Sequence, residues 1–348
     1  MGKKGQKPTL GFKPAAVTKR LLAVLTARGR DVLVKRYGLG ERPERMTLEA
    51  IGQIYGITRE RVRQIENYSM STIGKSEQYE KEQQAFDDLE ELIHSLGVIV
   101  PEDEFLSTVS KDESTRNHIH FLLVVGSPFV RCKEDEHFTH RWHVNADMAH
   151  KVEDALERLY ESLSDDELIP EGELIRAFLE HLKDVSEHYR DEEILRRWLG
   201  LTKKIDRNPL GEWGRVSSQN VRLRGVRDYA YLVIREHGSP MHFSEVARKI
   251  EELFNRRAHV ATTHNELIKD SRFILVGRGL YALSEWGYIK GVVKDVIRAV
   301  LKKYGPLSRD EIIEKVLKER YIKENTIVVN LQDAETFKRT SDGKYALV

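Results

Sequence analysis

The sequence predicts a mainly helical chain with small β-wings, an α+β fold in which a helix-turn-helix module precedes tandem winged-helix-like domains. Three observations predict this fold class. Apolar residues recur at helical spacing along most of the chain. Two such segments flank Gly56, which is the pattern of a helix-turn-helix. After residue 76, a unit of helices and one hairpin recurs roughly every 65 residues, as expected for winged helices.

The chain has 348 residues, more than one small core usually serves, so several domains are expected. The predicted domains are a basic N-terminal tail at residues 1–16, a helix-turn-helix module at 17–76, acidic winged-helix-like domains at 77–146 and 147–221, a further winged helix at 222–288 and a C-terminal winged-helix-like domain at 289–348.

Charge is segregated along the chain, although the net charge is only +1. Residues 1–75 hold 16 Lys and Arg against 6 Asp and Glu, residues 76–199 hold 13 against 31, and residues 200–348 hold 28 against 19. The basic ends indicate contact with a polyanion. The acidic middle would be repelled by phosphates, so it suits a protein partner or solubility.

The number of cysteines and the distribution of apolar residues indicate the cellular compartment of the protein. The single cysteine, Cys132, excludes an internal disulfide, and the lysine-rich start "MGKKGQKPTLGFK" lacks the apolar core of a signal peptide. The sequence also has no run of about 18 apolar residues. We therefore expect a cytoplasmic protein with no membrane contact.

The helix-turn-helix module begins with the segment "VTKRLLAVLTARGRDVLVKRYGLG". Its apolar spacing predicts two short amphipathic helices that are broken near Gly29 and end at Gly38. Thr47 is predicted to cap the next helix, and Gly56 supplies the turn before a second cap at Thr58.

The helix that follows Thr58 lies in "ITRERVRQIENYSM" and has arginines and an amide near its N-terminus. A recognition helix meets base edges in the major groove at this position. Arg binds guanine in a bidentate manner, Gln pairs with adenine and Glu accepts from the cytosine amino group, each contact being worth about 1 to 3 kcal/mol of discrimination. Three kinds of base reader are therefore present within two turns: Arg59, Glu60, Arg63 and Gln64. The alternative is an exposed helix of a small bundle.

The segment "RDVLVKRYGLGERPERMTLEAIGQIYGITRERVRQIENYSMSTI" resembles region four of the housekeeping sigma factor family, whose helix-turn-helix recognises the promoter element near minus thirty-five. The motifs "VLVKRYGL", "TLEAIG" and "GITRERVRQIE" match in order and spacing, whereas Ala50 replaces the usual acidic or amide residue. The resemblance implies base contacts by Arg59, Glu60, Arg63 and Gln64, and a phosphate contact by Arg61. Thr58, the predicted cap, is a further predicted phosphate contact.

This resemblance covers about residues 17–76. Nothing in the remainder resembles sigma region two, whose aromatic residues capture the melted promoter strand. We therefore expect a chain that does not open promoters by itself.

Four hairpin-like segments follow the helix-turn-helix. "RFILVGRGLYALSEW" at 272–286 and "TFKRTSDGKYALV" at 336–348 both run from Phe through a polar glycine turn to Tyr-Ala-Leu. Weaker versions occur at 128–144 and 203–216. Each is predicted to form the wing of a winged helix.

The unit at 222–288 contains "HGSPMHFSEVARKI" and "TTHNELIKDSRFILVGRGLYAL". In these segments it resembles the HARE-type helix-turn-helix domain, which occurs in the delta subunit of bacterial RNA polymerase and in restriction and chromatin proteins. The long acidic tail of the delta subunit is absent here and acidic character lies instead in the middle units, so the resemblance does not imply the displacement activity of that subunit.

The last unit is rich in lysine and arginine. Its predicted wing carries three cations, Lys338, Arg339 and Lys344, which would contact phosphate as part of a second DNA-binding element. For the lysines and arginines of this unit as a whole, a solvated helical face is the alternative explanation.

Signs of metal binding and catalysis are weak. Four potential ligands lie in "CKEDEHFTHRWH": Cys132, His137, His140 and His143. Spacings of three residues along a strand put successive side chains on opposite faces, and no CxxC pair closes a tetrahedral site. The sequence has no phosphate-cradling GxxxxGK[ST], nucleophile elbow or HExxH motif. We expect no metal, no cofactor, no small-molecule substrate and no enzymatic activity.

The sequence therefore predicts a DNA-binding transcription regulator that acts with bacterial RNA polymerase. Its partners would be double-stranded DNA, through a minus-thirty-five-like element, and the core polymerase, whose flap region four binds in the family. One alternative is a protein-binding adaptor built on winged helices. A restriction- or defence-associated DNA-binding protein is the other.

Overall fold

The computed structural model describes residues 10–182, 185, 187–189 and 191–348. Residues 1–9 of the predicted basic tail lie outside the described residues. The chain divides into two compact units, residues 1–206 and 207–348. Within the described residues the elements are mainly helices accompanied by small antiparallel sheets, so the predicted fold class is confirmed.

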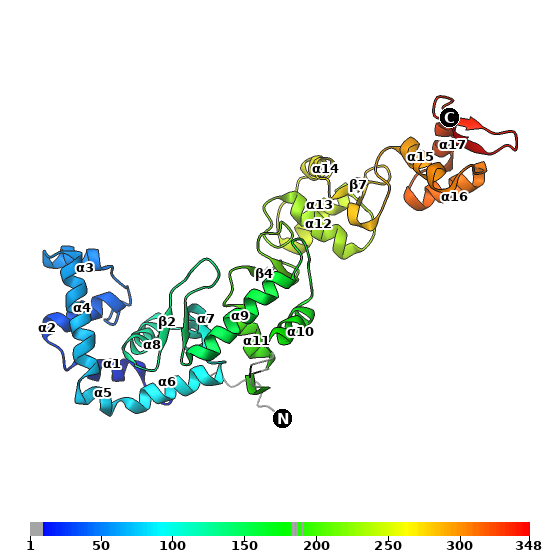
Figure 1. Cartoon of the computed structure of the whole chain (residues 1–348). Helices are drawn as coiled ribbons and strands as arrows, with labels where there is room; N and C mark the ends of the chain where they lie inside the picture. Colours follow the sequence, from blue (N-terminus) through cyan, green and yellow to red (C-terminus); the bar gives the residue numbers. More distant parts are fainter. Residues whose placement is uncertain (1–9, 183–184, 186, 190) are drawn as a thin grey trace. The chain divides into compact units, whose positions relative to one another are not determined.

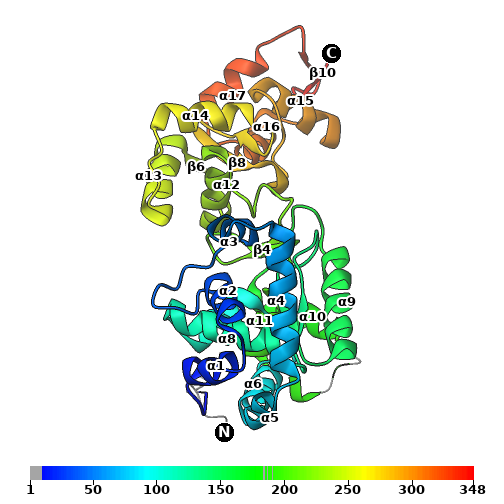
Figure 2. The same cartoon turned by 90° about the vertical axis from the view of Figure 1, so that its left-hand side faces the viewer.

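The first unit begins with five helices, α1 (Pro14–Leu22), α2 (Ala27–Tyr37), α3 (Leu48–Tyr55), α4 (Arg59–Gly74) and α5 (Glu77–Lys81). Figure 1 and Figure 2 both show α3 at one end of α4 and α5 at its other end. The long helix α4 therefore connects the helix-turn-helix to the rest of the unit.

Two helices form as predicted and the second ends at Gly38, but the break between them lies at residues 23–26 and not at Gly29. The helix α1 already ends at Leu22, and Thr26 caps α2 by accepting a hydrogen bond from the backbone N of Gly29 at 3.2 Å. Gly29 lies in the first turn of α2, where an added Cβ would be 2.7 Å from the Oγ of Ser69 on α4. The glycine therefore allows two helices to pack closely and does not break one.

The next part of the first unit surrounds a three-stranded sheet. Its elements are α6 (Gln83–Ser95), β1 (Ile99–Pro101), α7 (Glu102–Val109), α8 (Glu113–Val125), β2 (Val130–Cys132) and β3 (Arg141–His143). The strand order is β1-β3-β2, and Trp142 on the central strand lies opposite Val100 on one side and Arg131 on the other. Both pairings are antiparallel.

One hydrophobic core joins the helix-turn-helix helices to this sheet-containing part. Leu21 of α1, Leu33 of α2 and Ile73 of α4 pack in the same cluster as Phe86 of α6 and Phe121 of α8. Burial of each such side chain contributes roughly 1.5 to 3 kcal/mol. The core is therefore continuous across residue 76, where the sequence predicts a domain boundary.

Polar contacts reinforce the same junction. Arg20 of α1 donates two hydrogen bonds, at 2.5 and 2.7 Å, to the carboxylate of Glu82. The side-chain amide of Asn117 on α8 donates to the backbone oxygens of Gly38 and Pro43, and its oxygen accepts from Arg45 at 2.7 Å. These bonds hold the loop before α3 against α8.

The first unit ends with α9 (Ala146–Ser162), α10 (Glu171–His181), the 3-10 helix η1 (Glu187–Tyr189), α11 (Glu192–Leu199) and β4 (Ile205–Arg207), at which the unit boundary falls. The indole N–H of the buried Trp198 on α11 donates to the backbone oxygen of Gly97 at 3.1 Å, and Arg197 donates to the backbone oxygen of Leu96. These contacts dock α11 beside β1.

The second unit contains two winged helices. The first comprises α12 (Val226–His237), β6 (Met241–His242), α13 (Phe243–Phe254), α14 (Val260–Lys269), β7 (Phe273–Leu275), β8 (Leu280–Leu283) and the 3-10 helix η2 (Ser284–Trp286), preceded by β5 (Trp213–Arg215). The second comprises α15 (Val293–Tyr304), α16 (Arg309–Glu319), α17 (Glu324–Leu331), β9 (Phe337–Arg339) and β10 (Tyr345–Leu347). The sheet orders are β6-β8-β7 and β10-β9.

Strands form at all four predicted wing segments. The two clear predictions correspond to β7 with β8 and to β9 with β10, each an antiparallel pair. The two segments with weaker hairpin signals contain β2 with β3 and β4 with β5. Hairpin signals in this sequence thus located strands even where the Tyr-Ala-Leu motif is missing.

Candidate nucleic-acid interface

The helix-turn-helix is formed by α3, a short turn and α4. Thr47 caps α3 by accepting from the backbone N of Ala50 at 3.1 Å, and Thr58 caps α4 by accepting from that of Arg61 at 3.2 Å. Between the two helices, Gly56 has a φ of 63°, a left-handed conformation that glycine adopts without a steric penalty. Both predicted caps and the predicted turn are confirmed.

Packing on the rear face determines which side of α4 is exposed. Val62 of α4 is fully buried against Val32 of α2 and Ile51 of α3 in a small cluster of its own. The carboxylate of Glu66 accepts from the hydroxyl of Tyr37 at 3.0 Å. Burial, followed by the charge of Glu66, raises the pKa of that tyrosine. These contacts hold the rear of α4 against α2.

The four predicted base readers all lie on the opposite, exposed side of α4. Arg59, Glu60, Arg63 and Gln64 are exposed, as is the cap residue Thr58. In a helix, positions i, i+1, i+4 and i+5 occupy neighbouring parts of one face. The structure therefore places these side chains together at the N-terminal end of α4, the part of a recognition helix that contacts base edges.

The readers are paired with one another in the free chain. Arg63 donates two hydrogen bonds to Glu60, at 2.7 and 2.8 Å. The hydrogen bond from Arg63 is the main reason why the pKa of Glu60 lies below its usual range, so Glu60 is a carboxylate at neutral pH. Arg61 donates to the side-chain oxygen of Gln64 at 2.9 Å. Contact with bases or phosphates requires these surface bonds to be exchanged.

A hollow beside Arg61 adds a cation that the sequence analysis missed. It measures about 500 Å³ and is lined by Arg28, Arg61, Gln64 and Tyr68, among others. The guanidinium of Arg28 lies 5.3 Å from the ring centroid of Tyr55. Arg28 occupies the first turn of α2, far from α4 in sequence, and only the packing of α2 on α4 brings it beside Arg61. In the sequence, the one sign of this position was that the cation Arg28 directly precedes Gly29, the glycine that packs closely against α4.

Thr58 keeps a donor for phosphate while it caps α4. Its oxygen accepts from the backbone N of Arg61, which leaves the hydroxyl hydrogen free to be donated. Thr58 and Arg61 belong to the same first turn, where the helix dipole favours an anion. The phosphate contacts predicted for these two residues would thus fall on the same turn of α4.

The predicted cations of the last wing are exposed in the second unit. Lys338 and Arg339 lie on β9, and Lys344 directly precedes β10. The guanidinium of Arg339 donates to the backbone oxygen of Gly343 in the turn at 3.3 Å. The wing therefore presents three cations along one short hairpin.

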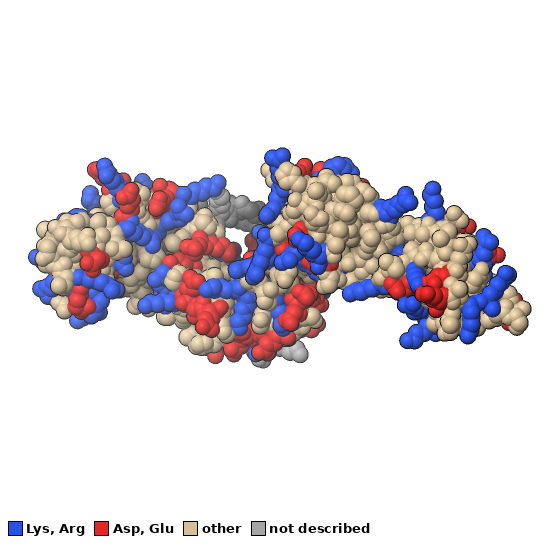
Figure 3. Space-filling model, turned by 90° about the horizontal axis from the view of Figure 1, so that it is seen from above, with Lys and Arg blue, Asp and Glu red and all other residues tan. Residues whose placement is uncertain are grey.

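Acidic side chains gather over another part of the first unit. In Figure 3, Asp and Glu concentrate where α9 and α10 lie, on the face in view. Exposed acids of these helices include Asp147, Glu161 and Glu173. This face would repel the phosphate backbone, which makes it unfavourable for DNA binding.

The four potential metal ligands of "CKEDEHFTHRWH" have other surroundings. His137 contacts the carboxylate of Glu157 at 2.5 Å, and His143 is buried on β3. Burial raises the pKa of the Cys132 thiol, which makes it a poorer ligand. Among the described residues, no group of three or more His, Cys, Asp and Glu side chains is arranged to hold a metal ion.

The helices of the described ranges include none that is both long and apolar enough to cross a membrane.

Two segments of the chain match family models. Residues 21–73 match "Sigma-70, region 4", and residues 225–286 match the HARE-type model, a helix-turn-helix domain whose description names ASXL and restriction endonuclease proteins. The first segment contains the helix-turn-helix with its exposed readers, and the second coincides with the first winged helix of the second unit. Both resemblances seen in the sequence are confirmed at these residues.

Curated sigma factors match the region-four part of the chain. The RNA polymerase sigma factor RpoS of Coxiella burnetii is 54% identical over 48 residues, 14% of this chain and 13% of that protein. The RNA polymerase sigma factor SigA of Nostoc sp. is 54% identical over 48 residues, 14% of this chain and 12% of that protein. The chain thus spans about an eighth of the length of the curated relatives it matches. It combines segments similar to two DNA-binding families, sigma-70 region 4 and the HARE-type helix-turn-helix.

Proposed function

We propose that this chain is a non-catalytic, DNA-binding transcription regulator that works with bacterial RNA polymerase and recognises a minus-thirty-five-like element through α4. The observation that carries the proposal is the arrangement of Arg59, Glu60, Arg63 and Gln64 on the exposed side of a helix whose rear face is buried. Arg28, Arg61 and Thr58 flank these readers and supply phosphate contacts.

The apolar side of the helix-turn-helix module is covered by other helices of the chain, which favours DNA as the partner of its exposed side. The apolar faces of α1, α2 and α4 pack against α6 and α8 of the same chain. In the described part of residues 17–76, the exposed large apolar side chains are Val24, Ile54 and Tyr68. Because the centre of a protein interface is apolar, this surface favours duplex DNA over the polymerase flap as the partner of the module.

The chain would act without opening promoters. Its match to the two sigma factors covers 48 residues, 13% and 12% of their length, and the segment similar to sigma-70 region 4, residues 21–73, contains the helix-turn-helix. We therefore assign promoter recognition to this chain and strand separation to another factor of the polymerase.

Selection and footprinting test the proposal. The full chain is incubated with a pool of random duplexes, and the recovered sequences are footprinted with and without core polymerase. A shared motif protected by the chain, with protection extended by the polymerase, is the expected result. The double variant Arg59→Ala, Arg63→Ala serves as the control and should recover no motif. Recovery of random sequences by the wild-type chain, or the absence of any effect of polymerase, would contradict the proposal.

A second candidate function concerns the winged helix at 222–288. One face of its third helix, α14, exposes Val260 (46%) and Ile268 (62%), and Lys269 is the only Lys or Arg among the residues of this helix, all of which are described. Such a face is poorly suited to phosphate and is better suited to a protein surface.

This candidate predicts that Ile268→Asp abolishes co-purification of core polymerase while DNA affinity is retained. The neighbouring exposed residue supplies the control, because Asn265→Asp adds the same charge without removing apolar surface. Equal recovery of polymerase with both variants would exclude α14 as the contact.

A further inference from the structure

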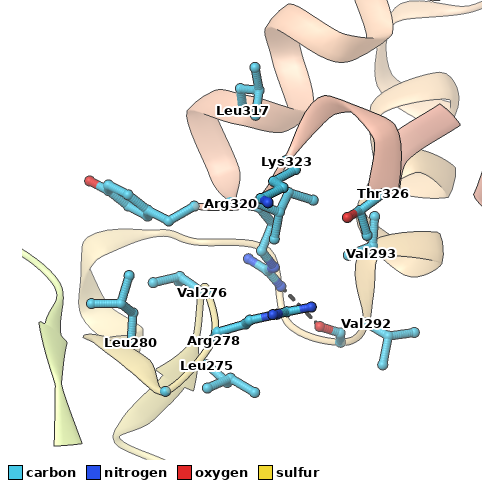
Figure 4. Close-up of a pocket in the computed structure, with 15 residues that line it drawn as sticks. Leu275, Val276, Arg278, Leu280, Val292, Val293, Leu317, Arg320, Lys323 and Thr326 are labelled. Carbon is cyan, nitrogen blue, oxygen red and sulfur yellow. Dashed lines mark hydrogen bonds between the residues drawn. The ribbon is translucent and has the colours of Figure 1, made fainter.

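A cavity of about 850 Å³ lies within the second unit, between the wing of its first winged helix and the second winged helix. The wing contributes the segment from Leu275 to Leu280, and the loop before α15 contributes Val292. The other wall comes from the end of α16 and the start of α17, including Leu317 and Lys323. Figure 4 shows these side chains around the cavity. Its volume is within the range of small-molecule sites.

Specific backbone contacts form the junction between the two walls. The backbone N of Tyr321 donates to the oxygen of Val276 at 2.7 Å, and Gly277 pairs with Tyr321 in a parallel bridge. A Cβ on Gly277 would lie 2.8 Å from the oxygen of Tyr321, so the close approach depends on glycine. Specific backbone contacts therefore hold the two walls of the cavity together.

The charged side chains that line the cavity are all cationic: Arg278, Arg320 and Lys323. In the described part of the chain, neither Arg278 nor Lys323 forms an ion pair. Figure 4 shows the side chain of Arg278 extending from the wing toward Val292. Arg278 and Lys323 thus bring positive charge to the cavity that no ion pair among the described residues neutralises.

Arg320 gives the strongest indication of an anion site among these cations, because it is buried, with 3% of its surface exposed. Its guanidinium donates to the backbone oxygens of Glu319, Ile289 and Gly291, the last at 3.0 Å. A guanidinium has five N–H donors, so two of them have no acceptor among the described residues. Burial lowers the pKa of Arg320, and Glu319 offsets only part of this effect.

The rest of the lining is apolar and partly open to solvent. Leu275 is 51% exposed and Val292 is 67% exposed, whereas Val276 is fully buried. Apolar surface around a few converging cations is the chemistry of a site for an apolar molecule that carries one negative charge.

We propose that this cavity binds a small amphipathic carboxylate, whose anionic group is held by Arg278 and Arg320 and whose hydrocarbon part packs against Leu275, Leu280 and Val292. Because both winged helices supply walls, the bound molecule would link them and act as an effector of the regulator. This site is separate from the recognition helix α4, which lies in the other unit.

Calorimetric titration of the full chain with octanoate tests the proposal, with octan-1-ol and acetate as probes that lack the charge or the hydrocarbon chain. We expect octanoate to bind at least about tenfold more tightly than either probe. Hydrogen exchange at the amide of Tyr321 should slow in the presence of octanoate, which would locate the molecule in this cavity.

Three variants sharpen the test. Arg278→Ala should weaken octanoate binding by about tenfold or more, because it removes a charged hydrogen-bond donor. Val292→Asp places a negative charge at the cavity and should have the same effect, and aspartate at this N-cap position of α15 is favourable for the helix. Arg309→Ala removes an exposed cation outside the cavity and should leave binding unchanged. Far-ultraviolet circular dichroism checks that each variant folds.

Three results would overturn the proposal: equal affinity of the wild-type chain and Arg278→Ala for octanoate, equal affinity for octanoate and octan-1-ol, or no binding of carboxylates from hexanoate to dodecanoate. Binding of a hexapeptide of alternating leucine and aspartate in place of octanoate would also overturn it, because the occupant would then be an acidic protein segment.

Discussion

Glu60 and Arg63 hold each other on the surface of α4 before any DNA is bound. The two hydrogen bonds between them keep Glu60 ionised and the guanidinium of Arg63 in one orientation. An exposed ion pair of this kind is weak, whereas a bidentate contact to a base edge in the groove is stronger. The pair therefore orders these two side chains in advance, and the proposed contact with DNA would replace it.

The two arginines on either side of Val62 are predicted to have different roles. Arg63→Ala should reduce discrimination at one base pair by roughly tenfold, because a bidentate base contact is lost. Arg61→Ala should weaken binding to all sequences about equally and lower the salt slope by about 1, as expected for one lost phosphate contact. Titrations of a selected site and of its single-base variants at several salt concentrations measure both effects. The reverse outcome would exchange the two assignments.

His120 is a buried titratable residue in the core of the first unit. Its ring lies between Tyr37 and Trp142, and neither ring nitrogen has a hydrogen-bond partner among the described residues. Burial, followed by the charge of Arg45, lowers the pKa of His120 to about 4. The nearby carboxylate of Glu102 accepts two hydrogen bonds from Arg131 and remains charged.

The free energy of unfolding of the first unit should therefore fall as the pH is lowered from about 6.5 to about 4. The unfolded chain takes up a proton on His120 in this window and the folded chain does not, so acid favours unfolding, by on the order of 1 to 3 kcal/mol. Well above pH 6.5 His120 is neutral in both states and contributes no pH dependence. Urea unfolding followed by tryptophan fluorescence at pH 7 and pH 5 measures the change.

Substitution of His120 should reduce this dependence. Phenylalanine cannot take up a proton, and Glu102 would keep its bonds from Arg131 and from the indole of Trp142. His120→Phe should thus flatten the pH profile, whereas His150→Gln, on the exposed side of α9, should not. An unchanged profile for His120→Phe would assign the acid sensitivity to other groups, such as His118 and His143, whose pKa values burial also lowers.

At the scale of elements, the turn between α3 and α4 is the part of the site least tolerant of change. Gly52 on α3 faces this turn, and an added Cβ would lie 2.6 Å from the backbone oxygen of Ile57. Because that neighbour is backbone, it cannot move without opening the turn. The angle between α3 and α4, and with it the direction of the readers, thus depends on this glycine.

Gly52→Ala should destabilise the first unit by about 1 to 3 kcal/mol and abolish recovery of a specific DNA site. Gly74→Ala, at the end of α4, is the matched control, since an added Cβ there would have no neighbour within 4 Å. The control should be neutral or stabilising by up to about 1 kcal/mol, because alanine favours the helix. Unfolding curves and DNA titrations of both variants decide the matter; wild-type behaviour of Gly52→Ala would show that the turn adapts.

The elements were predicted well wherever the signal is local. The caps Thr47 and Thr58 and the turn at Gly56 follow from short-range chemistry, since each involves residues at most a few positions apart. The break assigned to Gly29 was wrong because glycine has two uses, and the one that applies here is close contact with Ser69, 40 positions away. A sequence pattern does not distinguish a helix-ending glycine from one that admits a neighbouring helix.

At the scale of the whole molecule, cations occur in both units while acids concentrate in one region. The readers and their flanking cations lie in the first unit, and the wing with Lys338, Arg339 and Lys344 lies in the second. Each phosphate that is neutralised on binding releases counterions, so the salt dependence of affinity counts the phosphate contacts of the entire chain. This measurement requires no knowledge of how the units are placed.

Combined replacement of the three wing cations is predicted to reduce the number of phosphate contacts that the salt dependence reports. The triple variant Lys338→Ala, Arg339→Ala, Lys344→Ala should lower the slope of log affinity against log salt by about 1 for each lost contact, without changing base preference. The triple variant Lys302→Ala, Lys303→Ala, Lys318→Ala removes cations from the helices of the same winged helix and is the control. If the wing variant leaves both affinity and slope unchanged, its cations form only a solvated surface.

The sequence by itself determined the fold class and the location of the helix-turn-helix and wings, and it supplied the prediction of which residues read the bases. These depend on periodicity, caps and turns, which are short-range properties of the chain. The readers are adjacent in sequence and share one helix, so helical geometry alone brings them to one face.

Only the tertiary structure decided which surfaces remain available. It showed that the apolar sides of α1, α2 and α4 are covered by α6 and α8, that Arg28 lies beside Arg61, and that Arg278 and Arg320 line one cavity. Each of these arrangements joins residues that are distant in sequence. Their proximity results from the packing of whole elements, and no local pattern of residues specifies it.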